Sequence, residues 1–325
     1  MFKSNSFFNN NSFNLNKFNK NIKKTKKVLN NLTAEINNFE IPVLESYMKN
    51  YFFDFSSKTI NKFSKYKNII IIGMGGSILG TKAIYSFFRE KIKKKLFFFD
   101  NLDENLISEF KKIKNINNSC FIVVSKSGNT LETLTNFNVI FSKSYFKNKL
   151  IIISEIKDNS LLKIASEFKA EIIEHKDFIG GRYSVLSEVG MVPSALMKLK
   201  INKFHNLEKL LKNKKFISLL IKDVAVIYTL MSKGIRNSVI LNYDSRLNDL
   251  CFWYQQLTAE SLGKKGKGIN PMISFAPKDH HSLLQLYLDG PKDKFFTFFN
   301  TKKNTKKYKI SKSFNINGKK LLKNK

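Results

Sequence analysis

The fold of this chain is decided by the stretch Ile69-Ile70-Ile71-Ile72-Gly73-Met74-Gly75-Gly76-Ser77. A second stretch has the same form, Val123-Val124-Ser125-Lys126-Ser127-Gly128-Asn129-Thr130. In each, an apolar run typical of a buried strand stops at a turn rich in glycine and hydroxyl residues, and a helical pattern follows. Such a turn directs backbone N–H groups and the positive end of a helix dipole at one point. Two of them in nearby strand–helix units predict a single anion site at the carboxyl edge of a parallel sheet.

Strand-like and helical segments alternate from residue 69 onward, which predicts an α/β fold with a parallel sheet that has helices on both faces. The predicted strands are 69–73, 96–99, 120–125, 150–154 and 171–174. The predicted helices between and after them are 77–92, 104–113, 130–143 and 159–168. A second, smaller α/β unit has predicted strands at 238–242 and 272–275 and predicted helices at 244–262 and 281–288.

These patterns divide the chain into three parts. Residues 1–64 are expected to form a helical, partly disordered N-terminal segment, because residues 1–30 are rich in Asn, Lys and Phe. Residues 65–200 are expected to form the first domain. Residues 201–325 are expected to form the second domain.

The formal charge of +32 admits two interpretations. A nucleic-acid binder would carry clustered Arg and Lys with interleaved aromatic residues. Only four of the 57 basic residues are arginines, and the lysines are spread over the chain, with denser runs at 91–95 and 302–325. We therefore attribute the charge to composition and a solvated surface and expect no nucleic-acid partner, with the lysine-rich tail as the candidate for the alternative.

Several classes of protein are excluded by what the sequence lacks. No run of about 18 apolar residues is present, so we expect no membrane span, and residues 1–27 lack the apolar core of a secretory signal. Cys120 and Cys251 lie inside apolar patterns far apart, which predicts reduced, buried thiols in a cytoplasmic protein. No histidine has metal-ligand spacing with Cys or another His, so we expect no metal site.

The two glycine- and hydroxyl-rich turns each leave an alternative open. A dinucleotide loop needs G-x-G-x-x-G and an acid about 20 residues later, and here the third glycine is displaced although Asp100 lies near that distance. A sugar-phosphate loop with Ser77 as a donor fits better, and a plain strand–helix turn is the remaining alternative. In the second turn, Ser, Asn and Thr are good helix caps and Glu132 favours a first turn. Capping alone does not explain so many donors beside a second glycine loop.

Three further stretches carry candidate catalytic groups. Gly180-Gly181-Arg182-Tyr183-Ser184 keeps an arginine in a lysine-rich chain, which favours a need for a planar guanidinium over an incidental surface turn. Glu260 lies near the end of a predicted helix, where it could act as a general base or pair with Lys264 on the surface. His280 and His281 begin a further helix, where they could perform acid–base chemistry or simply lie on the surface.

In their order along the chain, these segments resemble the glucose-6-phosphate isomerase family, also called phosphoglucose isomerase, from about residue 65 to about 300. The matching motifs are Gly75-Gly76-Ser77-x-Leu79-Gly80, Ser125-Lys126-Ser127 through Thr130-x-Glu132-Thr133, Gly180 to Ser184, Gln256-x-x-x-Glu260-Ser261-x-Gly263-Lys264 and His281-x-x-x-Gln285-Leu286. The resemblance implies two doubly wound sugar-isomerase (SIS) domains with parallel sheets flanked by helices. It also implies an enzyme of glycolysis and gluconeogenesis that interconverts glucose 6-phosphate and fructose 6-phosphate.

The resemblance further implies a role for each matching residue. The hydroxyls and the lysine of the two turns would hold the phosphate, with Gly76 lining the loop: Ser77, Ser125, Lys126, Ser127 and Thr130. Glu260 would move a proton between C2 and C1 through a cis-enediol intermediate, Arg182 would stabilise its negative charge, and Gln256 would line the sugar. His281 would open the sugar ring from the neighbouring subunit of a homodimer. Neither a metal nor an organic cofactor is implied.

The chain departs from the family pattern near its end, where no segment matches the family's C-terminal lysine motif. We therefore expect the second domain to be C-terminally truncated. The alternative function is a non-catalytic sugar-phosphate-binding protein, or an inactive fragment, on the same fold. Because a pure binder needs the hydroxyl loop but not Glu260, Arg182 and His281, the presence of all three favours the isomerase.

Overall fold

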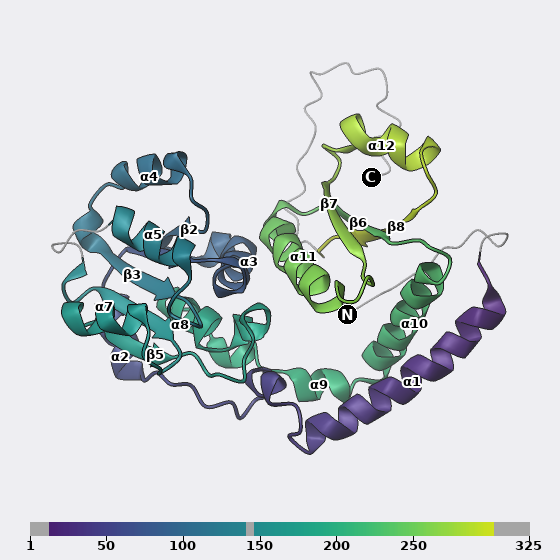
Figure 1. Cartoon of the computed structure of the whole chain (residues 1–325), viewed down its shortest axis with the longest axis horizontal. Helices are drawn as coiled ribbons and strands as arrows, with labels where there is room; N and C mark the ends of the chain where they lie inside the picture. Colours follow the sequence, from purple (N-terminus) through teal and green to yellow (C-terminus); the bar gives the residue numbers. More distant parts are fainter. Residues whose placement is uncertain (1–12, 141–145, 302–325) are drawn as a thin grey trace, which may run out of the picture.

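The computed structural model describes residues 13–140 and 146–301, and its elements gather around two parallel sheets (Figure 1). The first sheet has the strand order β2-β1-β3-β4-β5, and every pair of neighbours is parallel. Its strands are β1 (Asn68–Gly73), β2 (Lys95–Phe99), β3 (Ser119–Val124), β4 (Leu150–Ser154) and β5 (Glu171–Glu174). All five predicted strands are confirmed, and the order changes direction beside β1, as in doubly wound folds.

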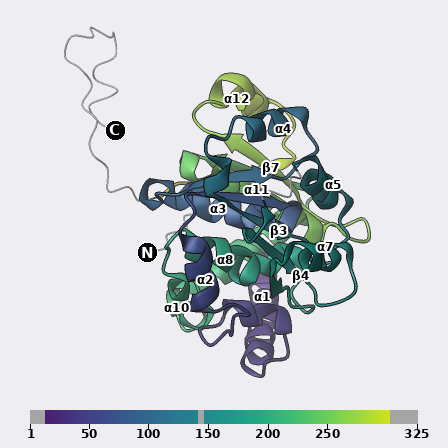
Figure 2. The ribbon, with the colours of Figure 1, turned by 90° about the vertical axis from the view of Figure 1, so that its left-hand side faces the viewer.

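The central strands of this sheet are buried on both faces, because helices cover both. Along β1, Ile69 and Ile71 belong to one apolar core and Ile70 and Ile72 to the other, as the two-residue period of a strand requires. The helices of this unit are α2 (Ser57–Ser64), α3 (Leu79–Phe88), α4 (Glu104–Lys111), α5 (Leu131–Val139), α7 (Ser160–Phe168) and α8 (Glu188–Leu196). Figure 2 shows this layering of helices about the strands. The continuous isoleucine run is therefore the signature of a strand with no solvent face.

The second sheet has three parallel strands in the order β7-β6-β8. They are β6 (Asn237–Asn242), β7 (Asn270–Phe275) and β8 (Lys294–Phe299), with α11 (Asn248–Leu262) and α12 (His280–Asp289) as the intervening helices. Its small core contains Val239, Leu241 and Tyr287. The strands β6 and β7 and both helices were predicted from the sequence. Strand β8 was not predicted, and its aromatic run pairs along the whole of β6.

The N-terminal region was predicted to be helical and partly disordered. Helix α1 (Leu15–Asn37) occupies much of the segment expected to be partly disordered, and residues 1–12 lie outside the described part of the chain. It lies alongside α10 (Lys214–Met231), and α9 (Leu207–Leu211) precedes that helix (Figure 1). The Asn21 side-chain amide donates a 2.9 Å hydrogen bond to the Thr229 hydroxyl inside this packing. Tertiary contact with a distant helix therefore stabilises a segment whose composition is unfavourable for a core.

Two helices begin later in the sequence than predicted, because a short 3-10 turn precedes each of them. Gly75–Ser77 forms such a turn (η2) before α3, and Ser245–Leu247 forms another (η7) before α11. The predicted helix at 130–143 ends at Val139 in α5, and its last three positions lie outside the described residues. Both cysteines are buried free thiols, as expected. None of the described helices has the length and apolarity that crossing a membrane requires.

Candidate active site

The glycine turn after β1 lies directly against the turn that carries Arg182. A Cβ atom on Gly76 would stand 2.3 Å from the carbonyl carbon of Gly181 and 2.5 Å from the backbone nitrogen of Arg182. No real Cβ tolerates such distances, so only glycine permits this backbone approach. Gly75 adopts a φ of +52° and lies close to the Gln256 amide. The structure thereby brings three predicted motifs, far apart in sequence, to the carboxyl end of β1.

Arg182 and Glu260 form the charged centre of this site. The Arg182 Nη1 donates to the Glu260 Oε1 at 2.7 Å, and the Arg182 Nε donates to the Ser261 hydroxyl at 2.9 Å. The Arg182 turn is Gly181–Leu186 (η5), and the Trp253 indole N–H donates to the Arg182 carbonyl at 3.3 Å. Glu260 lies in the last turn of α11, where the helix dipole disfavours negative charge, and the guanidinium offsets that disadvantage.

Gln256 forms a hydrogen bond with the second oxygen of the Glu260 carboxylate. Its Nε2 donates to the Glu260 Oε2 at 3.1 Å, since residues four apart share one face of α11. The Gln256 Oε1 is buried and has no hydrogen-bond partner among the described residues. A buried unpaired acceptor is costly, so this atom is a natural place for a donor group of a ligand.

The second predicted loop places its hydroxyls at the end of β3 and the start of α5. The hydroxyls of Ser125 and Thr130 are 2.7 Å apart, and the Thr130 side chain makes no capping bond to α5. Ser127 is exposed, and its hydroxyl accepts a 3.3 Å bond from the backbone N–H of Asn129. Ser77 is buried in the neighbouring turn after β1. This grouping of hydroxyls with a helix N-terminus suits an anion.

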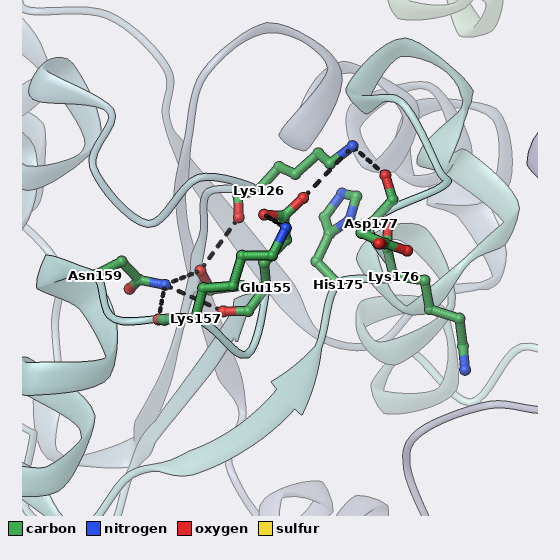
Figure 3. Close-up of polar contacts among 8 residues, drawn as sticks. Lys126, Glu155, Lys157, Asn159, His175, Lys176 and Asp177 are labelled. Atoms are coloured by element: carbon green, nitrogen blue, oxygen red, sulfur yellow. Dashed lines mark hydrogen bonds and ion pairs between the residues drawn. The ribbon is translucent and has the colours of Figure 1, made fainter.

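Lys126 belongs to this loop, but its ammonium extends elsewhere. The Lys126 Nζ donates to the Asp177 carbonyl at 2.6 Å and lies 3.6 Å from the Glu155 Oε1 (Figure 3). Both partners follow neighbouring strands, Glu155 directly after β4 and Asp177 shortly after β5. Within the described residues, the ammonium is therefore engaged on the side of β4 and β5 and makes no hydrogen bond to the loop hydroxyls.

His281 is the predicted site residue that the structure does not bring to the others. It is exposed in the first turn of α12, and the described residues show no hydrogen bond or ion pair between its ring and the Arg182–Glu260 pair. Its neighbour His280 instead pairs with the Tyr243 hydroxyl at 3.1 Å. Within this single chain, His281 is thus not part of the assembled cluster.

Two residues of the cluster were quoted in the sequence motifs without receiving a role. The Ser261 hydroxyl lies 3.0 Å from the Tyr183 hydroxyl and also accepts from Arg182. The hydrogen bond with Ser261, aided by Arg182, lowers the pKa of Tyr183. Their positions in the sequence, directly beside Glu260 and Arg182, could have indicated that they belong to the site. Ser261 therefore connects the arginine turn to the end of α11.

Asp100, the acidic residue of the dinucleotide alternative, is paired with a lysine. Asp100 forms a 2.7 Å ion pair with Lys82. Both line a cavity of about 380 Å³ that Asp249, Phe252 and Gln256 of α11 also line. The described part of the chain contains no group of three or more His, Cys, Asp or Glu side chains arranged to hold a metal ion.

Comparison with known proteins identifies the family of this chain. The family model described as phosphoglucose isomerase matches residues 30–277. A glucose-6-phosphate isomerase of Methanocaldococcus jannaschii is 39% identical over 250 residues, which cover 73% of this chain and 61% of that protein. The glucose-6-phosphate isomerase of Campylobacter jejuni is 31% identical over 256 residues, covering 73% of this chain and 61% of that protein. This chain thus spans about three fifths of the length of these curated relatives.

Solved structures show the same fold. A hypothetical protein of Thermus thermophilus, TT0462, superposes with a TM-score of 0.70 at 22% identity, covering 87% of this chain and 73% of that one. A glucose-6-phosphate isomerase of Chlamydia trachomatis superposes with a TM-score of 0.61 at 21% identity, covering 74% and 51%. The fold, the match of the family model and the identity to the curated relatives together show that this chain belongs to the phosphoglucose isomerase family.

Proposed function

We propose that this chain carries the catalytic site of an isomerase that interconverts glucose 6-phosphate and fructose 6-phosphate. The observation that carries the proposal is the Arg182–Glu260 pair, held at 2.7 Å beside the glycine turn that follows β1. A carboxylate and a guanidinium are the two groups that a proton transfer next to a carbonyl needs, one as base and one as stabiliser of negative charge. The chain's family supports the same reaction.

Glu260 is the proposed base. A carboxylate has about four lone-pair positions, and the contacts from Arg182 and Gln256 leave some of them free. Half of the Glu260 side chain is exposed, which leaves it accessible to a substrate. In the proposed reaction Glu260 removes the proton from C2 of the open-chain aldose. The C2–H electron pair forms the C1–C2 double bond while the π electrons of the C1 carbonyl move to O1, which gains a proton, and the product is a cis-enediol. The same carboxylate then returns the proton to C1 as the O2 hydroxyl loses its proton and the C2 carbonyl forms.

Arg182 is the proposed stabiliser of the intermediate. Guanidinium offers five N–H donors, of which the Nε and one Nη1 donor are engaged by Ser261 and Glu260. The remaining donors are available for the negative charge that develops on the substrate oxygen. Because Trp253 and Ser261 fix the turn and the guanidinium beforehand, little reorganisation is needed during the reaction.

The hydroxyl loop is the proposed phosphate site, and the remaining roles complete the reaction. In this proposal Ser77, Ser125, Ser127 and Thr130 supply hydroxyls to the phosphate, and Gly76 and Lys126 supply backbone N–H groups; all of these residues follow β1 or β3 in the chain. Gln256 lines the sugar through its unpaired Oε1. The exposed position of His281 is compatible with ring opening in a neighbouring subunit of a homodimer. We place this reaction in the cytoplasm, without a metal or an organic cofactor.

The proposal is tested by following the conversion of fructose 6-phosphate to glucose 6-phosphate with a coupled dehydrogenase, for the 325-residue chain beside Glu260→Gln. The amide preserves shape and hydrogen bonding but cannot accept the proton. Turnover that disappears in the variant supports the proposal. Sugar-phosphate binding without turnover in the unchanged chain contradicts it and favours a non-catalytic sugar-phosphate binder.

A further inference from the structure

Glu155 holds Lys126 through both its main chain and its side chain. The Glu155 N–H donates to the Lys126 carbonyl at 3.0 Å, and the Glu155 carboxylate lies 3.6 Å from the Lys126 ammonium. The other carboxylate oxygen is 3.1 Å from the Lys157 Nζ (Figure 3). Glu155 is well shielded, with 16% of its side chain exposed, so its charge is not simply solvated. The residue that follows β4 therefore contacts the hydroxyl loop at Lys126.

The turn that follows β4 also contacts the hydroxyl loop at Gly128. Gly128 has a φ of +68°, and a Cβ placed on it would stand 2.1 Å from the amide carbon of Asn159. The Gly128 carbonyl also accepts from the Leu161 N–H at 3.1 Å. Asn159 is 4% exposed, and its amide donates to the carbonyl of Lys157 at 2.9 Å. The residues from Ser154 to Leu161 therefore contact the hydroxyl loop at Gly128 as well as at Lys126.

The third attachment lies at the end of β5. The Lys126 ammonium donates to the Asp177 carbonyl at 2.6 Å, and the buried His175 ring lies beside this contact (Figure 3). A lysine ammonium has three donors, and an acidic partner together with a carbonyl satisfies much of their demand. An ammonium engaged by these two partners has little donor capacity left for a ligand of the loop.

We propose that Lys126 is a positioning residue, whose ammonium ties the hydroxyl loop to the ends of β4 and β5 through Glu155 and the Asp177 carbonyl. The phosphate is then bound by the loop's hydroxyls and backbone N–H groups, and the ammonium is not a direct ligand. This inference rests on the proposed function to the extent that the loop is taken to bind phosphate.

The two roles for Lys126 predict opposite effects of Glu155→Gln on the binding of inorganic phosphate. If the ammonium were a direct ligand, removal of Glu155 would free it and delete a repulsive charge, so phosphate would bind more tightly. If the ammonium is a tether, the same change loosens the loop, and phosphate binds about threefold to fivefold more weakly, in line with the worth of a partly exposed ion pair. Lys126→Met also loses the bond to Asp177 and weakens binding about tenfold.

The experiment is calorimetric titration with inorganic phosphate at constant ionic strength, for the unchanged chain, Glu155→Gln, Lys126→Met and the double variant. Because the chain is strongly basic, phosphate can also bind nonspecifically to its surface. Only the phosphate binding that is lost in Thr130→Val is therefore counted as binding to the loop. The matched control is Lys157→Met, which removes the other cation beside Glu155 without touching the loop and should leave the dissociation constant unchanged. Lys126→Arg should restore most of the affinity, and thermal unfolding verifies that each variant is folded.

Weaker binding in Glu155→Gln, with a double variant no weaker than Lys126→Met, supports the tether. Tighter binding in Glu155→Gln, or independent additive losses, overturns it. Absence of any counted phosphate binding by the unchanged chain overturns the tether together with the phosphate site. Phosphate binding without sugar-phosphate isomerisation contradicts the proposed function alone.

Discussion

Replacing Gly76 with alanine tests how closely two backbone segments meet at the site. The added methyl would stand 2.3, 2.4 and 2.5 Å from the Gly181 carbon, the Gly181 oxygen and the Arg182 nitrogen. Ordinary van der Waals contact begins at about 3.4 Å, so the two turns must separate by about 1 Å. All three atoms are backbone, and no side chain can rotate away to relieve the clash.

The expected size of the effect follows from this displacement. Overpacking of a fixed backbone contact costs about 1–3 kcal/mol of the free energy of unfolding. Because Arg182 is carried by the displaced turn, its guanidinium no longer meets Glu260 at 2.7 Å. A shift of about 1 Å in a catalytic group reduces turnover by about a hundredfold.

Gly181→Ala is the matched control, because a Cβ at Gly181 meets no atom within 4 Å. The free energy of unfolding is measured by urea denaturation, and turnover is measured in the coupled assay. We expect Gly181→Ala to change the stability by less than about 0.5 kcal/mol. Equal stability of Gly76→Ala and Gly181→Ala, with turnover of Gly76→Ala preserved, would refute the close approach of the two turns.

Three further outcomes are expected from the site and the core. Arg182→Lys keeps the charge but loses the fork that meets Glu260 and Ser261 together, so kcat in the coupled assay should fall about a hundredfold or more, and an undiminished kcat would contradict the role of the guanidinium. Ser261→Ala should lower the free energy of unfolding by about 0.5–1.5 kcal/mol through the lost hydrogen bonds, and unchanged urea denaturation would oppose this. Burial lowers the pKa of His175 and His205 below the ordinary value of 6.5, so the folded chain binds fewer protons than the unfolded chain; stability is complete above pH 6.5 and is lost as the pH falls below it. The thermal midpoint should therefore drop between about pH 7 and about pH 5.5. The drop should be smaller in His205→Gln, and an equal drop in both chains would show that His205 does not contribute to the pH dependence of stability.

The first sheet could be predicted because its information is local. The isoleucine run of β1 and the apolar run of β3 are buried at every position, and continuous apolar runs are typical of central parallel strands. The candidate site could be predicted in composition for a similar reason, since Gly76, Arg182 and Glu260 each stand out from their surroundings in sequence.

The features that could not be read from the sequence depend on contacts between distant segments. Helix α1 packs through Asn21 onto Thr229, which lies 208 residues later, and no local pattern announces this partner. Strand β8 is stabilised by pairing with β6 along its length, while its surrounding sequence lacks a following helical pattern. Side-chain direction was equally inaccessible: the sequence placed Lys126 in the hydroxyl loop, but only the structure shows its ammonium bonded beside β4 and β5.

Isotope exchange shows whether Glu260 moves a proton between C2 and C1. The chain is incubated with glucose 6-phosphate in heavy water, and proton NMR follows deuterium appearing at C1 of fructose 6-phosphate and at C2 of recovered glucose 6-phosphate. We expect incorporation by the unchanged chain and none by Glu260→Gln, because a base exchanges its captured proton with solvent. Incorporation that persists in Glu260→Gln would contradict the account.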